Sequence, residues 1–95
     1  MPRIIISDNI LCKLEEKHNV TPAEVHECFA NRCGNFLLDT REEHASEPPT
    51  RWFVSETNYG RKLKIVFIWR DKKVFLRTAY PANPIEIRMY TEAHK

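Results

Sequence analysis

Residues 51–80, RWFVSETNYGRKLKIVFIWRDKKVFLRTAY, decide the fold of this chain. Apolar and polar residues alternate there with a period of two, which is typical of half-buried β-strands. The pattern predicts three strands, at Arg51–Asn58, Arg61–Arg70 and Lys73–Tyr80. Tyr59-Gly60 is a two-residue turn signal, because glycine adopts a positive φ freely, and Asp71-Lys72 is a weaker one because it lacks glycine. The stretch therefore predicts a small antiparallel sheet.

These turns also predict which side chains share a face. The first turn pairs Val54 with Ile65 and Trp52 with Phe67, so that these four side chains join the apolar core. The second turn pairs Val66 with Arg77 and Ile68 with Phe75, although a one-residue slip there would move Arg77 to the core side. The opposite face then carries basic and aromatic residues: Arg51, Phe53, Lys62, Lys64, Phe75 and Arg77. A basic, partly aromatic sheet face predicts an anionic partner, with nucleic acid as the expected one.

Composition bounds the remaining possibilities. A chain of 95 residues with a net charge of +2 predicts one soluble domain, in which a nucleic-acid site must come from local clustering of charge. Its three cysteines are odd in number and lack CxxC spacing, which argues against a disulfide framework and against a zinc site. The apolar run at Ile4–Ile6 is too short for a signal peptide or a membrane span, so the expected location is cytoplasmic.

The flanking segments predict the other elements. We expect a strand at Arg3–Ile6, a helix from Ser7 or Asp8 to about Lys17, and a short strand at Asn35–Asp39. Thr21-Pro22 followed by Glu24 predicts a capping box at the start of a second helix that ends near Ala30. Asn83-Pro84 followed by Glu86 predicts the same motif at a final short helix. The expected fold is α+β, with an N-terminal strand and two helices, an antiparallel sheet of about four strands and a C-terminal helix.

Several short motifs follow one another in an order known from one family. They are Lys17-His18-x-Val20, Asp39-x-Arg41-x-x-His44, Arg51-Trp52, and Thr78-Ala79-Tyr80 followed by Glu86 and Tyr90. Over nearly the whole chain, these residues and the order of elements resemble BrnT-type toxins of the RelE/ParE superfamily. The chain departs from the family pattern at Tyr80, where the family has the arginine of its S-A-R motif, and at Arg77, where the family usually has an apolar residue.

The resemblance implies a single RelE-like toxin domain over residues 1–95. Members of the family are implied to be small endoribonucleases that cut RNA and inhibit translation, each neutralised by a protein antitoxin. The resemblance implies no metal and no cofactor. It leaves open a dimer or a hetero-oligomer with the antitoxin.

RNA cleavage needs cations at the phosphate and groups that move protons. We expect Arg51, Lys64 and Arg77 to clamp phosphate, with Lys62 adding charge. His44 and Tyr80 are the candidate proton-transfer groups, and we count His44, Arg51, Arg77 and Tyr80 as the candidate catalytic residues. Phe53 and Phe75 are candidates to stack bases. The alternatives are a solvated basic sheet face, a solvated loop histidine and phenylalanines covered by the final helix or by a partner.

Two functions remain open from the sequence, and a third is disfavoured. The first is the ribonuclease toxin. The second is a non-catalytic binding module on the same scaffold, which binds RNA or a protein partner without cutting, and Tyr80 in place of the family arginine favours it. A magnesium-dependent hydrolase of ADP-ribosyl groups is disfavoured because the chain shows no acidic cluster that would hold the metal.

Overall fold

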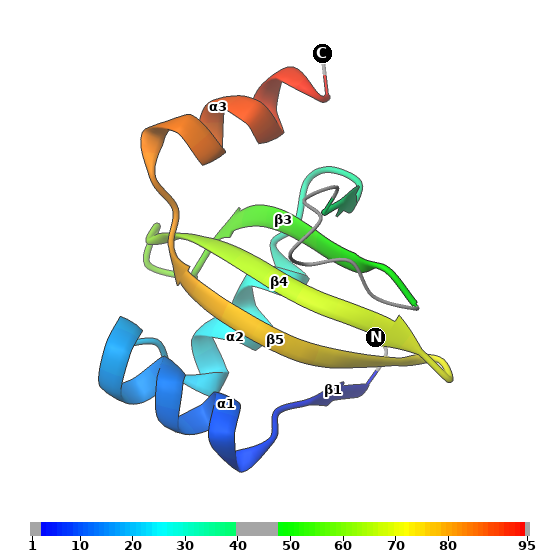
Figure 1. Cartoon of the computed structure of the whole chain (residues 1–95). Coiled ribbons are helices and arrows are strands. Elements are labelled where there is room, and N and C mark those ends of the chain that lie inside the picture. Colours follow the sequence, from blue (N-terminus) through cyan, green and yellow to red (C-terminus); the bar gives the residue numbers. More distant parts are fainter. Residues whose placement is uncertain (1–2, 40–47, 95) are drawn as a thin grey trace.

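A five-stranded mixed sheet forms the centre of the computed structural model, which describes residues 3–39 and 48–94 (Figure 1). The strands are β1 (Arg3–Ile5), β2 (Leu37–Leu38), β3 (Thr50–Glu56), β4 (Lys62–Arg70) and β5 (Lys73–Pro81). They lie in the order β1-β5-β4-β3-β2. The helical segments are α1 (Asp8–Lys13), the π-helical turn η1 (Leu14–His18), α2 (Pro22–Ala30) and α3 (Pro84–Glu92). The fold is therefore of the expected α+β class.

The N-terminal strand makes the sheet mixed. β1 runs parallel to β5, with Arg3 beside Lys73 and Ile5 beside Phe75. Every other pair of neighbouring strands is antiparallel. The sequence predicted an antiparallel sheet of about four strands and did not predict that β1 joins it in parallel. That pairing was missed because the partner of β1 is distant in the chain and no local turn signals it.

Capping boxes begin two of the helices, as predicted. The Thr21 hydroxyl accepts from the Glu24 N–H at 3.2 Å, and the Glu24 carboxylate accepts from the Thr21 N–H at 3.0 Å. Asn83 and Glu86 make the same reciprocal pair at 2.8 and 3.1 Å. Each box satisfies two N–H groups that a helix start leaves without partners. The second box fixes Glu86 at the foot of α3.

The first hairpin is shifted by one residue from the prediction. Trp52 pairs with Val66 rather than with Phe67, and Phe53 pairs with Ile65. Because side chains alternate along a strand, this shift moves every β3 side chain to the opposite face. The predicted register of this hairpin was wrong.

The turn explains the shift. The Thr57 N–H donates to the Arg61 carbonyl oxygen at 2.9 Å, which leaves a three-residue loop between them. Gly60 ends this loop with a φ of 83°, in the left-handed region. A loop of three residues with glycine in that position is a common hairpin connection, and it changes the pairing by one residue relative to a two-residue turn.

The second hairpin turns where the sequence predicted. Asp71 and Lys72 both have positive φ, at 53° and 61°, as a type I′ turn requires. Ile68 pairs with Phe75, in agreement with the prediction. The strained turn residues show that the flanking strands determine this turn more than its own composition does.

A β-bulge interrupts the pairing of β4 with β5 farther along. Phe67 pairs with Leu76, but the next residue, Val66, pairs with Thr78. Arg77 is the extra residue, and its side chain is exposed. The predicted pairing of Val66 with Arg77 was therefore wrong, because one residue of β5 is left out of the ladder.

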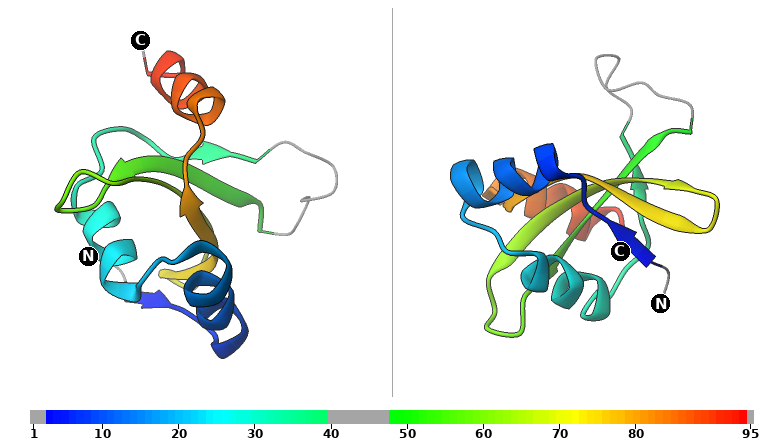
Figure 2. Two further views of the ribbon diagram at one scale, coloured as in Figure 1. Left: turned by 90° about the vertical axis from the view of Figure 1, so that its left-hand side faces the viewer. Right: turned by 90° about the horizontal axis from the view of Figure 1, so that it is seen from below.

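Helices cover both sides of the sheet (Figure 2). On one side, Phe29 of α2 packs edge-on against Phe53 and Phe67, with ring centroids 4.8 and 5.5 Å apart. On the other side, Trp52 contacts Tyr90 of α3 at 6.0 Å between ring centroids. We call these sides the α2 face and the α3 face. Since both faces bury apolar side chains, alternation in the sequence did not reveal the register.

Candidate functional site

The predicted basic cluster is not assembled on one face. Lys62 and Lys64 lie on the α3 face, as their pairing with Glu56 and Val54 requires. Arg51 pairs with Phe67 and therefore lies on the α2 face, where its buried Nε has no hydrogen-bond partner among the described residues. Arg77 sits in the bulge. The shifted hairpin and the bulge thus separate the three residues of the predicted phosphate clamp, so that part of the prediction was wrong.

The two candidate stacking residues have different surroundings. Phe53 is 0% exposed in the core, so the prediction that it stacks a base was wrong, because stacking needs an accessible ring. Phe75 is half-buried on the α3 face, with the Arg70 guanidinium 5.2 Å from its ring centroid. His44 lies outside the described residues.

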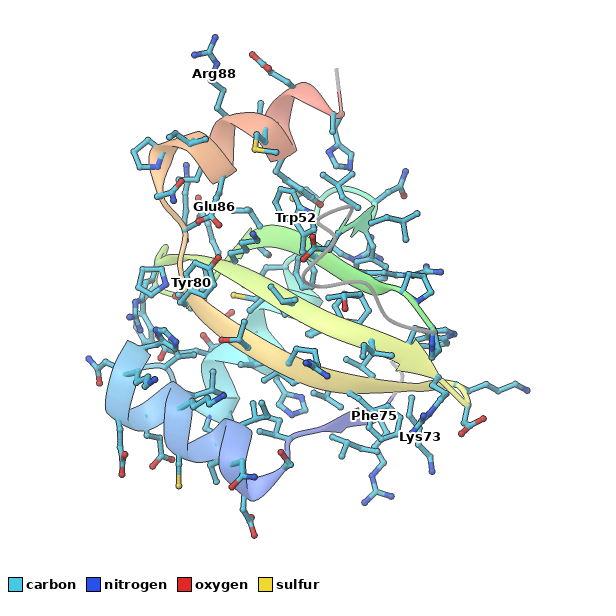
Figure 3. All side chains as sticks on the ribbon, in the orientation of Figure 1. Trp52, Lys73, Phe75, Tyr80, Glu86 and Arg88 are labelled. Carbon is cyan, nitrogen blue, oxygen red and sulfur yellow. The ribbon has the colours of Figure 1, made fainter. Side chains whose placement is uncertain are left out.

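A different polar cluster forms where β4 and β5 meet the foot of α3. The Lys64 ammonium lies 2.9 Å from Glu86 Oε2, and the Tyr80 hydroxyl donates to the same oxygen at 2.7 Å. The side chains of Lys64 and Glu86 are only 8% and 13% exposed. Figure 3 shows Tyr80 and Glu86 close together at the end of β5 that leads into α3. Lys64, Tyr80 and Glu86 form the candidate site.

Local structure places each member of the site. Lys64 and Tyr80 are direct partners in the antiparallel pairing of β4 with β5. Glu86 reaches them because its other oxygen accepts from the Asn83 N–H at 3.1 Å in the capping box. Burial alone would raise the pKa of Glu86, but the hydrogen bonds from Tyr80 and Lys64 outweigh it and hold that pKa below its ordinary value. Glu86 is therefore an ionised carboxylate in a largely buried site.

Aromatic rings enclose the ammonium group. Lys64 Nζ lies 4.6 Å from the centroid of the Trp52 ring and 5.9 Å from that of Tyr80. Both distances fall within the range of a cation–π contact. The rings fix the position of the ammonium and exclude water from part of its surface, which strengthens its interaction with Glu86.

The π-helical turn η1 brings His18 to the other side of Tyr80. The two rings lie 5.6 Å apart at an interplanar angle of 40°. Arg61 holds the end of η1, because its guanidinium donates to the carbonyl oxygens of Asn19 and His18 at 2.7 and 3.2 Å. The sequence predicted a helix to about Lys17 and did not predict the π-helical geometry. Turns of this kind are rare and occur frequently at functional sites.

The site opens onto a hollow between α3 and the edge of the sheet. Its volume is about 670 Å³, and Lys64 and Glu86 lie on its wall. Apolar side chains form much of the rest: Leu37, Trp52 and Met89. The hollow therefore has one polar wall, formed by a largely buried ion pair, and a lining that is apolar over much of the rest, as is common for ligand pockets.

Sequence reasoning included Lys64 and Tyr80 in the site but missed the role of Glu86. A signal was present, because Lys64 interrupts the apolar run Leu63–Ile68 and a buried lysine needs a counter-charge. Glu86 was identified as a capping residue and as part of the motif after Tyr80, but it was not counted among the site residues.

Within residues 3–39 and 48–94, no three His, Cys, Asp or Glu side chains gather closely enough to hold a metal ion. In the same residues, no helix combines the length and apolar character needed to span a membrane. Comparison of the chain with protein-family models, with curated proteins and with solved structures found no match.

Proposed function

We propose that this chain is a metal-independent endoribonuclease toxin of a toxin–antitoxin pair, which cuts RNA, inhibits translation in the cytoplasm and is neutralised by a protein antitoxin. The resemblance of its motifs to BrnT-type toxins motivates the proposal. The observation that carries it is the meeting of the Lys64 ammonium and the Tyr80 hydroxyl at one oxygen of Glu86, at 2.9 and 2.7 Å. A cation, a base and a proton donor are the groups that RNA cleavage needs.

The proposed reaction uses the 2′-hydroxyl of RNA as its nucleophile. The 2′-oxygen attacks the adjacent phosphorus while the bond from phosphorus to the 5′-oxygen breaks, which leaves a 2′,3′-cyclic phosphate and a free 5′-hydroxyl. Ionised Glu86 takes the proton of the 2′-hydroxyl, and Tyr80 gives its proton to the leaving 5′-oxygen. Glu86 then returns a proton to Tyr80 across their 2.7 Å hydrogen bond, so both side chains end as they began.

Lys64 supplies the electrostatic part of the proposed mechanism. In the free protein its charge is balanced by Glu86. Once Glu86 accepts a proton, that balance is lost, and the ammonium becomes available to the phosphate as negative charge builds there. Because the pKa of Glu86 is lowered, the base is ionised at neutral pH, and on the acid side activity should fall as Glu86 becomes protonated.

Cell-free translation, with the RNA then run on a gel, tests the proposal. Tyr80→Phe removes the hydroxyl and keeps the ring against His18 and Lys64, so we expect cleavage to fall by about 10²-fold or more. Lys73→Gln is the control, because Lys73 is exposed at the opposite end of β5 (Figure 3). The wild-type fragments should carry 2′,3′-cyclic phosphate ends. Intact RNA with folded wild-type protein, or equal cleavage by Tyr80→Phe, would contradict the proposal.

The alternative is a non-catalytic binding module for RNA or a protein. It is favoured by the pairing of Lys64 with Glu86 in the free protein, which leaves little net charge to attract a phosphate. It is also favoured by Tyr80 at the position of the family arginine. Under this alternative, RNA stays intact in the translation reaction. RNA that binds should then shift in a native gel without being cut, and Tyr80→Phe should shift it as the wild type does.

A further inference from the structure

A second hollow lies beside β5, away from the ion pair of the candidate site. Its volume is about 540 Å³, and residues of β5, the end of β4, the end of β1 and α1 line it. Its lining includes three cationic side chains, from Lys13, Arg70 and Arg77, together with the ring of Phe75. We call it the β5 groove. Its cationic lining makes it complementary to an anionic chain.

The β-bulge supplies the central cation of this groove. Arg77 is the residue that the ladder leaves out, and its exposed side chain has no ion pair or hydrogen bond among the described residues. Bulges commonly redirect a side chain at functional edges of a sheet. Arg77 is therefore available for a ligand, whereas the same residue in a regular strand would lie against a neighbouring side chain.

Phe75 and Arg70 add a stacking surface. The guanidinium of Arg70 lies 5.2 Å from the Phe75 ring centroid, and the ring forms part of the groove wall. Asp71 approaches Arg70 to 3.9 Å, but the two side chains are 59% and 80% exposed, so solvent weakens this pair. Aromatic rings beside cations are the usual platforms for unpaired bases.

We propose that the β5 groove binds single-stranded RNA, with phosphates on Lys13, Arg70 and Arg77 and a base on Phe75. This inference rests on the proposed function, because it supplies the path of the strand beyond the candidate site. Phe75 and Tyr80 both lie on the α3 face, as their partners Ile68 and Lys64 show. Four residues of β5 lie between them, and one of these is the bulge residue Arg77, so their separation is that of the four steps from Lys64 to Ile68 on β4. At the rise of a strand this is about 13 Å. Figure 3 shows them toward opposite ends of β5, so a short single strand can reach both.

This placement gives Arg77 a positioning role. The sequence predicted Arg77 as a catalytic residue, but it lies in the groove rather than in the Lys64–Tyr80–Glu86 site. Its loss should therefore raise KM and leave kcat largely unchanged. Duplex RNA should bind more weakly than a single strand, because a base must leave its stack to contact Phe75.

Fluorescence anisotropy with a labelled single-stranded 2′-O-methyl RNA tests the groove separately from cleavage, since this probe lacks the nucleophilic hydroxyl. Arg77→Gln should weaken binding by about three- to fivefold and reduce the salt slope by about 0.7, the value for one lost phosphate contact on a single strand. Phe75→Leu should also weaken binding. Arg88→Gln is the matched control, because Arg88 is exposed on α3 and points away from the sheet (Figure 3).

Each result decides a separate point. Equal affinity of Arg77→Gln and wild type would overturn the groove, even if RNA is cut. Displacement of the RNA by polyglutamate at matched charge concentration would also overturn it, because an acidic protein would then be the better ligand. A lower kcat of Arg77→Gln with unchanged RNA binding would overturn it as well, because Arg77 would then act in the chemical step and not in the groove. Binding that depends on Arg77, with unmodified RNA left intact, would support the groove and contradict the nuclease.

Discussion

Glu24 and Glu86 provide an internal comparison that tests whether the candidate site is buried as described. Both are the glutamates of capping boxes, and each pairs with a cation near or in β4. The Glu24–Arg61 pair is 23% and 33% exposed, whereas the Glu86–Lys64 pair is 13% and 8% exposed. Glutamine also serves in capping boxes, so substituting either residue by Gln mainly removes its charge.

The expected losses of stability differ because of that burial. Glu24→Gln should lower the free energy of unfolding by about 0.5 kcal/mol, as for a solvent-exposed pair. Glu86→Gln leaves the Lys64 charge largely buried and unbalanced, which should cost about 3 kcal/mol. This is the low end for a broken buried pair, because the amide oxygen still accepts a hydrogen bond. The difference of about 2.5 kcal/mol corresponds to a melting temperature about 10 to 20 °C lower for Glu86→Gln.

Urea unfolding followed by tryptophan fluorescence and by circular dichroism measures both losses. Trp52 reports on the site directly, since its ring contacts Lys64. Equal midpoints for Glu24→Gln and Glu86→Gln, with equal m-values, would refute the view that Lys64 and Glu86 form a buried pair.

The same pair predicts the dependence of stability on pH. The pKa of Glu86 is lowered in the folded protein, since hydrogen bonds from Tyr80 and Lys64 outweigh the opposing effect of burial. A group with a lowered pKa stabilises the fold above its unfolded pKa and loses that contribution as the pH falls through its folded pKa. The gap in stability between wild type and Glu86→Gln should therefore be full at neutral pH and narrow below about pH 4. A gap that stays constant from neutral to strongly acidic pH would contradict the assignment.

Three further predictions concern the scaffold. Lys72→Gly should stabilise the protein by about 0.5 kcal/mol in urea unfolding, because Lys72 has a φ of 61°, and a loss would contradict the type I′ turn. Gly34→Ala should destabilise it by about 1 to 2 kcal/mol, because the added methyl group would lie 2.7 Å from the imidazole of His94, and a second change, His94→Ala, should recover part of the loss. Cys28 is 0% exposed, and this burial, with smaller contributions from nearby carboxylates, raises the pKa of its thiol to about 12. A thiol reagent should therefore modify only the other two cysteines before the protein unfolds.

Local signals in the sequence predicted the parts of the fold that depend on neighbouring residues. Both capping boxes and the position of the Asp71-Lys72 turn follow from residues within one turn of each other. The pairing of Thr57 with Arg61 was not predicted, because a glycine that ends a three-residue loop resembles the glycine of a two-residue turn. The two loops give strand registers that differ by one residue. The apolar pattern is compatible with both registers, because helices cover both faces of the sheet.

The candidate site depends on contacts that no local pattern describes. The bulge that exposes Arg77 lies within an otherwise regular alternation, and nothing in the residues around it marks the position. Glu86 and Lys64 meet only because α3 folds back over β4, although each residue carries part of the signal. A lysine within an apolar strand needs a counter-charge when both faces are covered. A glutamate held at a helix start by its backbone hydrogen bonds has one oxygen left to provide it. The same reasoning explains why two basic residues of these strands differ in their surroundings. Lys64 is buried and paired with a carboxylate at the candidate site, whereas Arg77 is exposed at the bulge and accessible to a ligand.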